Sequence, residues 1–289
     1  MEKDKSEELT EDFEGIELPE SAVLRKVFRL PQGEFEEDWI VDEVPISLVY
    51  NGISHVVMMG TPKDLKEFAI GFSLTEGIVK SPDNIYNIEI VPACGKGIEV
   101  HLEISPEYFW KLKDYRRSMA GRTGCGICGT ESLDNVQKPV VPLPHTRTFD
   151  LRFYQKGLKA IEETQVIGKM TGATHAVVAL GKDGQVLGGC EDVGRHVAMD
   201  KLIGKMAGRL SEVNALFLSS RASFEMVQKA AMSGVEIVFA VSAPTLKAVE
   251  FARHCNMTLV AFSRNRKANV YCGEERLINK EGFFGGLPE

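Results

Sequence analysis

Short apolar runs alternate with amphipathic stretches in the second half of the chain. Helical spacing of apolar residues predicts helices over 156–168, 195–207 and 223–233 and another that begins at Pro244. The apolar runs predict strands at 175–180, 215–220, 236–241 and 257–263, and the turn at 181–185 leads into a further strand near 186–191. Strands and helices in this order predict a three-layer α/β sandwich with a largely parallel sheet.

The first half of the chain has a different pattern. Two apolar runs meet at Asn51-Gly52, a pair that predicts a β-hairpin. Helical spacing over 61–78 predicts a helix with Thr61 as N-cap and Pro62 at its first position. Two further strands are expected at 86–92 and 97–104. We therefore assign residues 27–115 to a small α+β domain, 116–148 to a glycine-rich mobile loop and proline-rich linker, and 149–289 to the α/β domain.

Charge is distributed unevenly along the chain. Residues 1–20 carry nine acidic and two basic side chains, which accounts for the whole formal net charge of -7. Because such a segment buries too little apolar surface to offset its ordering entropy, residues 1–26 are predicted to be a disordered acidic tail. The remaining chain is balanced in charge, which gives no reason to expect general affinity for nucleic acid or for membranes.

The N-terminus and the cysteines indicate a compartment. The N-terminus has no basic start followed by an apolar run, and no stretch approaches ~18 consecutive apolar residues, so neither a secretory signal nor a spanning helix is predicted. Six cysteines in a chain of this kind are expected to be reduced. The sequence therefore predicts a cytoplasmic protein.

A cysteine pair lies in the glycine-rich segment 124–129, where Cys125 and Cys128 form a Cys-x-x-Cys motif. A thiolate is the sulfur nucleophile, and nearby bases such as Arg122 favour the thiolate form. Flanking glycines permit wide backbone excursions. The motif therefore favours redox or sulfur-transfer chemistry. A structural zinc half-site is the alternative, but zinc normally takes four ligands, and the sequence has no second Cys-x-x-Cys and no His-x-x-x-His. We expect no bound metal.

Two predicted helix starts carry residues suited to an anionic ligand. Glu191 and Asp192 end a strand, and Arg195 and His196 open the following helix. A helix N-terminus favours anions, so the basic pair suits a phosphate, while the carboxylates suit ribose hydroxyls or base N–H groups. The structural alternative is helix capping by Asp192 with ordinary ion pairing. Ser220 and Arg221 repeat the arrangement one unit later, where the serine is as well explained as an N-cap.

A basic cluster follows the last predicted strand, where an α/β sheet collects its ligands. An anionic nucleotide or a pterin phosphate suits this position. By contrast, His175 is expected to be a core histidine, Cys190, Cys255 and Cys272 small core residues, and Cys94 has no assigned role. The candidate cofactor-binding segment consists of Phe262, Ser263, Arg264, Asn265, Arg266 and Lys267.

Several long motifs in the same order resemble the FdhD family, the sulfur carrier proteins required for formate dehydrogenase activity. The resemblance runs from about Glu43 to Arg276. It includes GRTGCGICG at 121–129, TGATHAVVAL at 171–180 and EDVGRHVAMDKLIG at 191–204, besides Asn51-Gly52 and TPKDLKEFAIGFSLTEGI at 61–78. It implies a C-terminal domain with a cytidine-deaminase-like fold, which agrees with the predicted element order.

The resemblance also implies a reaction and its partners. A cysteine desulfurase would supply persulfide sulfur, which the chain would pass to the molybdenum bis(guanylyl molybdopterin) cofactor before its insertion into formate dehydrogenase. By position Cys125 is similar to the family's persulfide-forming cysteine and Cys128 to its partner, and 262–267 is similar to the segment that binds the guanine nucleotide part of the cofactor. A homodimer is compatible with the resemblance. Whether Cys128 carries sulfur or only forms a disulfide with Cys125 stays open.

Three other functions are alternatives to sulfur transfer. A hydrolytic deaminase needs His-x-Glu or Cys-x-Glu and a later Pro-Cys-x-x-Cys, which the corresponding helix starts lack. A thiol–disulfide oxidoreductase of thioredoxin type places its cysteine pair after a strand at a helix start, whereas Cys125 lies in a glycine-rich connector. The third is a non-catalytic nucleotide-binding chaperone for the cofactor, in which the cysteines would be incidental.

Overall fold

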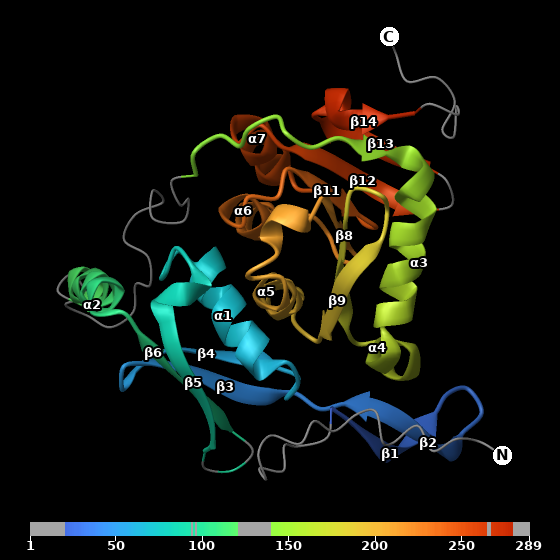
Figure 1. Ribbon diagram of the computed structural model, residues 1–289. Helices are drawn as coiled ribbons and strands as arrows, with labels where there is room; N and C mark the ends of the chain where they lie inside the picture. Colours follow the sequence, from blue (N-terminus) through green and yellow to red (C-terminus); the bar gives the residue numbers. More distant parts are fainter. Residues whose placement is uncertain (1–20, 94, 96, 121–139, 265–266, 280–289) are drawn as a thin grey trace.

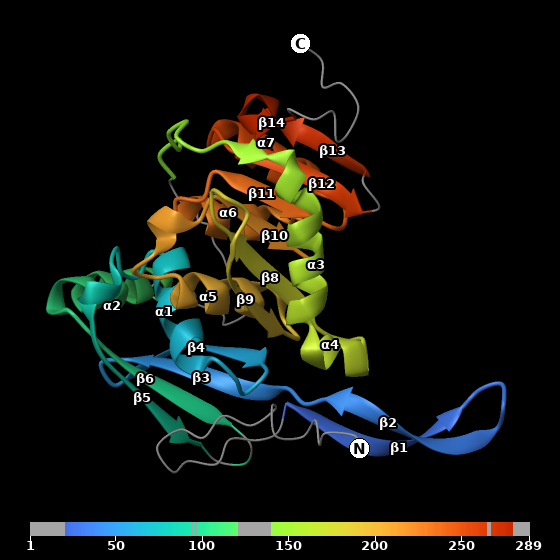
Figure 2. The same cartoon turned by 45° about the vertical axis from the view of Figure 1, so that its right-hand side comes forward.

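A computed structural model describes residues 21–93, 95, 97–120, 140–264 and 267–279. Two β-sheets lie on opposite sides of a layer of helices (Figures 1 and 2). The larger sheet belongs to the second half of the chain, and the smaller one to the first half. Among the described residues, no helix has the length and apolar character needed to cross a membrane.

The larger sheet has six strands in the order β13-β12-β11-β10-β8-β9. Of its neighbouring pairs, β10–β11 and β11–β12 are parallel, while β8–β9, β8–β10 and β12–β13 are antiparallel. The prediction of a largely parallel sheet is therefore wrong, because β8 and β9 are joined by a short turn that permits only antiparallel pairing. The strands are β8 (His175–Leu180), β9 (Val186–Asp192), β10 (Ala215–Leu218), β11 (Ile237–Ala240), β12 (Thr258–Arg264) and β13 (Lys267–Cys272).

Helices cover both faces of this sheet, as predicted for three layers. Ala176, Val178 and Leu180 of β8 pack with the residues of α3, whereas Val177 and Ala179 face the opposite helices. Burial on both faces explains why these strands are apolar at nearly every position. One face carries α3 (Tyr154–Thr164), which is followed by α4 (Val166–Thr171), and the other carries α5 (Arg195–Lys205), α6 (Phe224–Met232) and α7 (Leu246–His254).

Two helix boundaries differ from the sequence prediction. The stretch 156–168 is interrupted at Gln165, which separates α3 from α4. Helix α7 begins at Leu246 rather than at Pro244, because the hydroxyl of Thr245 accepts a hydrogen bond from the Ala248 amide (3.2 Å) and caps the helix.

The smaller sheet has the order β4-β3-β6-β5, with α1 (Leu65–Thr75) packed on it and α2 (Pro106–Ala120) nearby. The hairpin at Asn51-Gly52 is confirmed, with φ of 45° and 79° at the two turn residues. Thr61 does not cap α1, however, since the N-cap is Asp64. The strands are β3 (Val44–Tyr50), β4 (Ile53–Gly60), β5 (Ile85–Pro92) and β6 (Ile98–Ile104).

A two-stranded ribbon of β1 (Ala22–Arg29) and β2 (Glu34–Val41) projects beneath α4 (Figure 2). At its base, Ala22 and Val41 pack on Ile167 and Met170. The predicted disordered tail ended at residue 26, so its last part is a strand instead. Arg25 and Lys26, the charged residues in this part of the predicted tail, are exposed on the ribbon. Residues 1–20 lie outside the described residues.

Parts of the predicted loop and linker between the two halves are described by the structure. Helix α2 continues to Ala120, inside the predicted loop. Further on, Glu236 accepts hydrogen bonds from the Thr146 and Arg147 amides (3.0 and 3.1 Å), and the buried Arg276 donates to the Pro144 carbonyl (3.2 Å). Residues 144–147 are therefore fastened to the α/β part. Beyond them, β7 (Phe149–Asp150) pairs in parallel with β14 (Leu277–Ile278).

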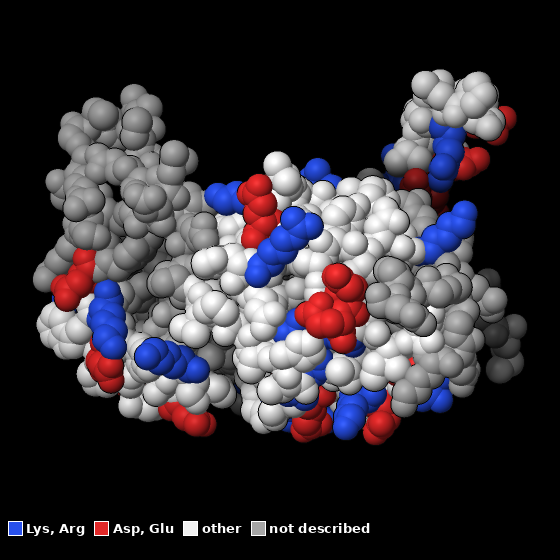
Figure 3. All heavy atoms as spheres, turned by 90° about the horizontal axis from the view of Figure 1, so that it is seen from above, with Lys and Arg blue, Asp and Glu red and all other residues white. Residues whose placement is uncertain are grey.

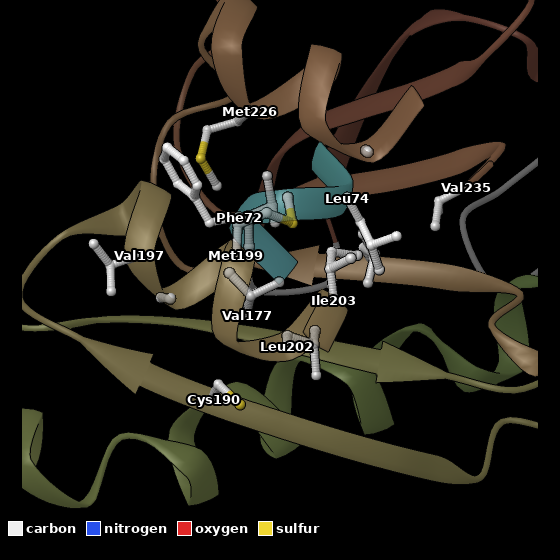
Figure 4. Close-up of a cluster of buried hydrophobic side chains, with 14 of the residues drawn as sticks. Phe72, Leu74, Val177, Cys190, Val197, Met199, Leu202, Ile203, Met226 and Val235 are labelled. Atoms are coloured by element: carbon white, nitrogen blue, oxygen red, sulfur yellow. The ribbon is translucent and has the colours of Figure 1, made fainter. Parts of the chain in front are cut away.

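The two halves share one hydrophobic core. Phe72 and Leu74 of α1 lie among Met199 and Ile203 of α5 and Met226 of α6 (Figure 4). Helices α1 and α5 cross at two glycines. A Cβ atom on Gly71 would lie 1.7 Å from the Asp200 carbonyl oxygen, and one on Gly204 would lie 1.8 Å from that of Glu67. The absence of side chains at these positions is what lets the two backbones approach so closely.

Two buried ion pairs of the second half also bond to residues of the first half. Lys201 Nζ lies 2.7 Å from Asp192 and 3.0 Å from the Thr61 carbonyl oxygen. Lys229 Nζ lies 2.9 Å from Asp200, whose other contacts include the Thr75 hydroxyl at 2.6 Å. Buried charges are tolerated only when they are paired in this way, so each half depends on groups supplied by the other.

Candidate functional site

The carboxyl ends of β10, β11 and β12 lie at one edge of the six-stranded sheet, which we call the carboxyl edge. Because β8 runs antiparallel to β10, β8 begins at this edge with His175, and β9 ends there with Asp192. The N-termini of α5, α6 and α7 follow β9, β10 and β11 at the same edge. The topology therefore gathers here most of the ligand-binding residues predicted from the sequence.

Arg195 is the first residue of α5, and Gly194 is the N-cap. The Nε atom of Arg195 is buried and has no hydrogen-bond partner among the described residues. The hydroxyl of Ser223, the N-cap of α6, is also buried and also has no hydrogen-bond partner there. Buried polar groups normally find partners, so two adjacent helix N-termini offer donors that the described chain leaves unused. An anion is the natural acceptor at such a place.

His175 lies between these two helix starts. In the sheet, its backbone lies opposite Asp192 of β9. The neighbouring Ala176 amide donates a hydrogen bond to the Ser219 hydroxyl (2.8 Å), directly after β10. Since side chains alternate along a strand, His175 shares its face with Val177, the face that α5 and α6 cover. Burial, and then the guanidinium groups of Arg195 and Arg221, hold the pKa of His175 below its usual value. The sequence prediction of a core histidine missed this cationic surrounding.

His196 is engaged by a carboxylate. Its Nε2 lies 2.7 Å from Glu225 Oε2 of α6. Burial lowers the pKa of His196, and the nearby Arg195 and Lys229 add to this effect, whereas Glu225 opposes it. The predicted phosphate contact at His196 would have to compete with Glu225.

The two carboxylates at the end of β9 are bonded to the protein. Glu191 accepts hydrogen bonds from the Ile167 and Gly168 amides (3.0 and 2.6 Å) at the start of α4. Asp192 is fully buried and accepts from the Gly194 amide (2.8 Å), from Lys201, and from the amide and hydroxyl of Thr61 (2.9 and 2.8 Å). Asp192 is therefore ion-paired, as the structural alternative expects, but it does not cap α5, whose N-cap is Gly194. Both carboxylates are occupied by contacts within the protein.

The second predicted helix start contributes a basic group. Arg221 is exposed, and Ser220 is buried with its hydroxyl donating to the Arg221 carbonyl (3.1 Å). Ser220 is not the N-cap of α6, since Ser223 holds that position. Of these two residues, only Arg221 presents its side chain to solvent.

The segment 262–267 lies at the carboxyl end of β12, as predicted. Phe262 adopts φ of +54°, a left-handed backbone conformation that is uncommon for a bulky residue, and its ring is 40% exposed. Ser263 is buried, Lys267 is exposed, and Arg264 is the last residue of β12. Strained conformations of this kind concentrate at binding sites. Asn265, Arg266, Cys125 and Cys128 lie outside the described residues, so their predicted roles stay predictions.

The described cysteines are structural. Cys190, Cys255 and Cys272 are free and buried, as predicted. Burial raises the pKa of the Cys190 thiol to about 12, so this sulfur is not a nucleophile near neutral pH. Within the described ranges, no group of three or more His, Cys, Asp or Glu side chains is placed to hold a metal ion.

On the face shown in Figure 3, Lys and Arg side chains are interspersed with Asp and Glu. At the carboxyl edge, the local positive charge comes from Arg195 and Arg221, and it favours an anion there.

The sequence model of the FdhD/NarQ family matches residues 41–278, which is most of the chain. The chain belongs to the FdhD/NarQ family. The match spans the cysteine pair, the carboxyl edge and the segment 262–267. The fold of this FdhD/NarQ protein is similar to that of a solved structure from Desulfotalea psychrophila, a protein provisionally assigned as a formate dehydrogenase accessory protein. The two chains are 23% identical with a TM-score of 0.73, and the similarity covers 89% of this chain and 100% of the other.

Proposed function

We propose that this FdhD/NarQ protein acts in the maturation of formate dehydrogenase as a sulfur carrier. The family match over residues 41–278 is the observation that carries the proposal, because it includes the Cys125–Cys128 segment together with the carboxyl edge. The similar fold of a protein provisionally assigned as a formate dehydrogenase accessory protein supports the same client. We further assign the α/β part to the cytidine-deaminase-like fold.

The first step is transfer of sulfane sulfur to Cys125. The Cys125 thiolate attacks the outer sulfur of a cysteine desulfurase persulfide, the sulfur–sulfur bond of that persulfide breaks, and the desulfurase cysteine leaves as a thiolate. The product is a Cys125 persulfide. One sulfur atom moves between two cysteines, so no net oxidant or reductant is needed.

The second step delivers sulfur to molybdenum in the cofactor, which is the substrate of the carrier. If Cys128 attacks the inner sulfur of the Cys125 persulfide, a Cys125–Cys128 disulfide forms and sulfur leaves as hydrosulfide. The two electrons that reduce the sulfur then come from the thiol pair. Alternatively, Cys128 accepts the outer sulfur and becomes the donor itself. Both routes return Cys125 to a form that can be loaded again, the first after reduction of the disulfide.

The carboxyl edge would hold the guanine nucleotide part of this substrate. Arg195 and Arg221 supply positive charge beside the N-termini of α5 and α6, which suits the phosphates. The partly exposed ring of Phe262 suits stacking against a base. The protein thereby positions a bound anion, while sulfur chemistry is left to the cysteine pair.

Intact-mass measurement tests the sulfur carrier. The protein is incubated with a cysteine desulfurase and cysteine, and a gain of one or more sulfur atoms is expected. A gain that disappears in Cys125→Ala assigns the sulfur to Cys125, whereas one that persists assigns it to another thiol. Loss of two hydrogens without any gain favours a thiol–disulfide oxidoreductase, and an unchanged mass favours a cofactor-binding chaperone.

Charge reversal at Arg264 and Arg266 should weaken GDP binding by at least roughly tenfold, because two charge-assisted contacts to phosphate would be lost. Isothermal titration against the wild-type protein measures the change. Reversal at Lys182 and Lys205 is the matched control and should have little effect, because both are exposed and lie at the opposite ends of β8 and α5 from the carboxyl edge. Equal affinity of the Arg264/Arg266 variant and the wild type would remove this segment from the binding site.

A further inference from the structure

Helix α2 carries an exposed aromatic side chain on the outside of the molecule. Its inward residues Tyr108, Phe109 and Leu112 are partly buried against the shared core, whereas Trp110 is 55% exposed. The helix lies at the periphery, away from the six-stranded sheet (Figures 1 and 2). Because single exposed apolar side chains are common on protein surfaces, the exposure of Trp110 alone does not indicate a function.

Positive charge accompanies this ring. Lys113 Nζ lies 4.8 Å from the centroid of the Trp110 ring, in a cation–π contact that keeps the ring and the ammonium group together at the surface. Tryptophan is enriched among the residues that dominate the energy of protein interfaces, and positive charge steers an acidic partner. Residues 111–122 hold one acid, Asp114, and five bases, which are Lys111, Lys113, Arg116, Arg117 and Arg122.

The place of α2 in the chain connects this face with the cysteine that the proposed function uses. Helix α2 ends at Ala120, and Cys125 follows five residues later. Five residues span at most about 18 Å even when fully extended. Trp110 precedes the end of the helix by ten residues, which is about 15 Å along the helix axis.

A protein that donates sulfur has to bring its own cysteine to Cys125, because the sulfur passes by direct attack of the thiolate on the outer sulfur of the persulfide. An interface of ordinary size covers about 800 Å² on each partner and is therefore roughly 30 Å across. This width is comparable with the distances along α2, so a donor protein that reaches the thiol can also contact Trp110 and Lys113. A small donor such as glutathione persulfide needs no such contact.

We propose that the exposed face of α2, centred on Trp110 and Lys113, is the surface on which the cysteine desulfurase docks while Cys125 attacks its persulfide. The matching surface of the desulfurase is acidic and has an apolar depression for the indole ring. Docking adds no chemical step, since the transfer is the exchange between two cysteines described above. The inference rests on the proposed function for the identity of the partner, and it adds the surface of this chain that selects that partner.

The rate at which Cys125 gains sulfur, followed by intact mass at increasing desulfurase concentration, tests the proposal. Trp110→Ala should raise the desulfurase concentration for half-maximal rate about tenfold and leave the maximal rate nearly unchanged, because a docking contact is lost while the reacting thiols stay the same. Lys113→Glu should also raise this concentration, and its difference from the wild type should shrink as salt screens the lost attraction. Loading from glutathione persulfide should be equal in the wild type and both variants.

Trp39→Ala is the matched control, because Trp39 is the other tryptophan of the chain, is 37% exposed and lies on the ribbon of β1 and β2. It should be loaded by the desulfurase as the wild type is. Lys113→Glu, which keeps the ring, carries the test if Trp110→Ala does not fold. An unchanged half-maximal concentration in folded Trp110→Ala would overturn the proposal. A change of oligomeric state in that variant without a change in loading would assign the face to a second copy and overturn it as well.

The two donors separate this inference from the sulfur carrier. If the variants are loaded by the desulfurase like the wild type, the docking surface is wrong and the sulfur carrier stands. Slower loading of the variants from glutathione persulfide would trace the effect to Cys125 itself and overturn the docking surface. If the wild-type protein gains no sulfur from either donor, the proposed function fails irrespective of α2.

Discussion

Replacement of Cys125 by alanine should reduce formate dehydrogenase activity to the level of a strain without this gene. The reason is chemical, since sulfane sulfur can be held only on a thiol, and the described cysteines are buried in the core. Formate oxidation in extracts of a deletion strain that carries the variant on a plasmid measures the effect.

Cys272→Ala serves as the control for this experiment. Cys272 is a buried thiol on β13, and its loss should leave activity close to that of the wild type. The variant Cys128→Ala tests whether delivery needs Cys128, since in both routes its Cys125 persulfide should form and not be discharged. The two routes differ in the wild-type product after delivery, which is a Cys125–Cys128 disulfide if Cys128 attacks the inner sulfur and a pair of thiols if Cys128 carries the sulfur. Full activity of Cys125→Ala would contradict the carrier mechanism.

Gly71→Ala should destabilise the protein by at least about 3 kcal/mol, at the upper end of the usual cost of overpacking. The added Cβ would meet the Asp200 carbonyl oxygen at 1.7 Å, and the obstacle is backbone that cannot rotate away. Helices α1 and α5 would have to separate and disturb the shared core. Thermal unfolding should show a midpoint lowered by roughly 6 °C or more.

Gly208→Ala is the matched control, because a Cβ at Gly208 meets nothing within 4 Å. It should unfold at about the wild-type temperature. Gly204→Ala should behave like Gly71→Ala, since its Cβ would lie 1.8 Å from the Glu67 carbonyl oxygen. A wild-type melting temperature for Gly71→Ala would show that the two helices are not packed as described.

The order of elements in the α/β part could be predicted because its strands are buried on both faces. In β8, β10 and β11, nearly every position is apolar, which leaves a continuous pattern in the sequence. Strand direction could not be predicted in the same way. The antiparallel placement of β8 beside β10 does not follow from local patterns, because it depends on which strands become neighbours.

The errors at the candidate site come from contacts between distant residues. Thr61 has the local features of an N-cap, yet its hydroxyl and amide bond to Asp192, 131 residues away. Lys201 occupies a helix position where a solvent-exposed charge would be expected, but it is fully buried against the same carboxylate. The sequence predicts a core histidine at position 175 because a buried strand begins there. Its cationic neighbours, Arg195 and Arg221, reach it only through the fold.

The close crossing of α1 and α5 limits how this polypeptide can be dissected. A fragment that began after residue 148 would uncover the side of α5 that packs on α1, and it would lack the Thr61 oxygens that help to hold Lys201. A fragment that ended before residue 148 would lack α5, on which α1 packs. Truncations, tags and insertions are therefore best confined to the ribbon of β1 and β2, which contacts the remainder mainly through its base on α4.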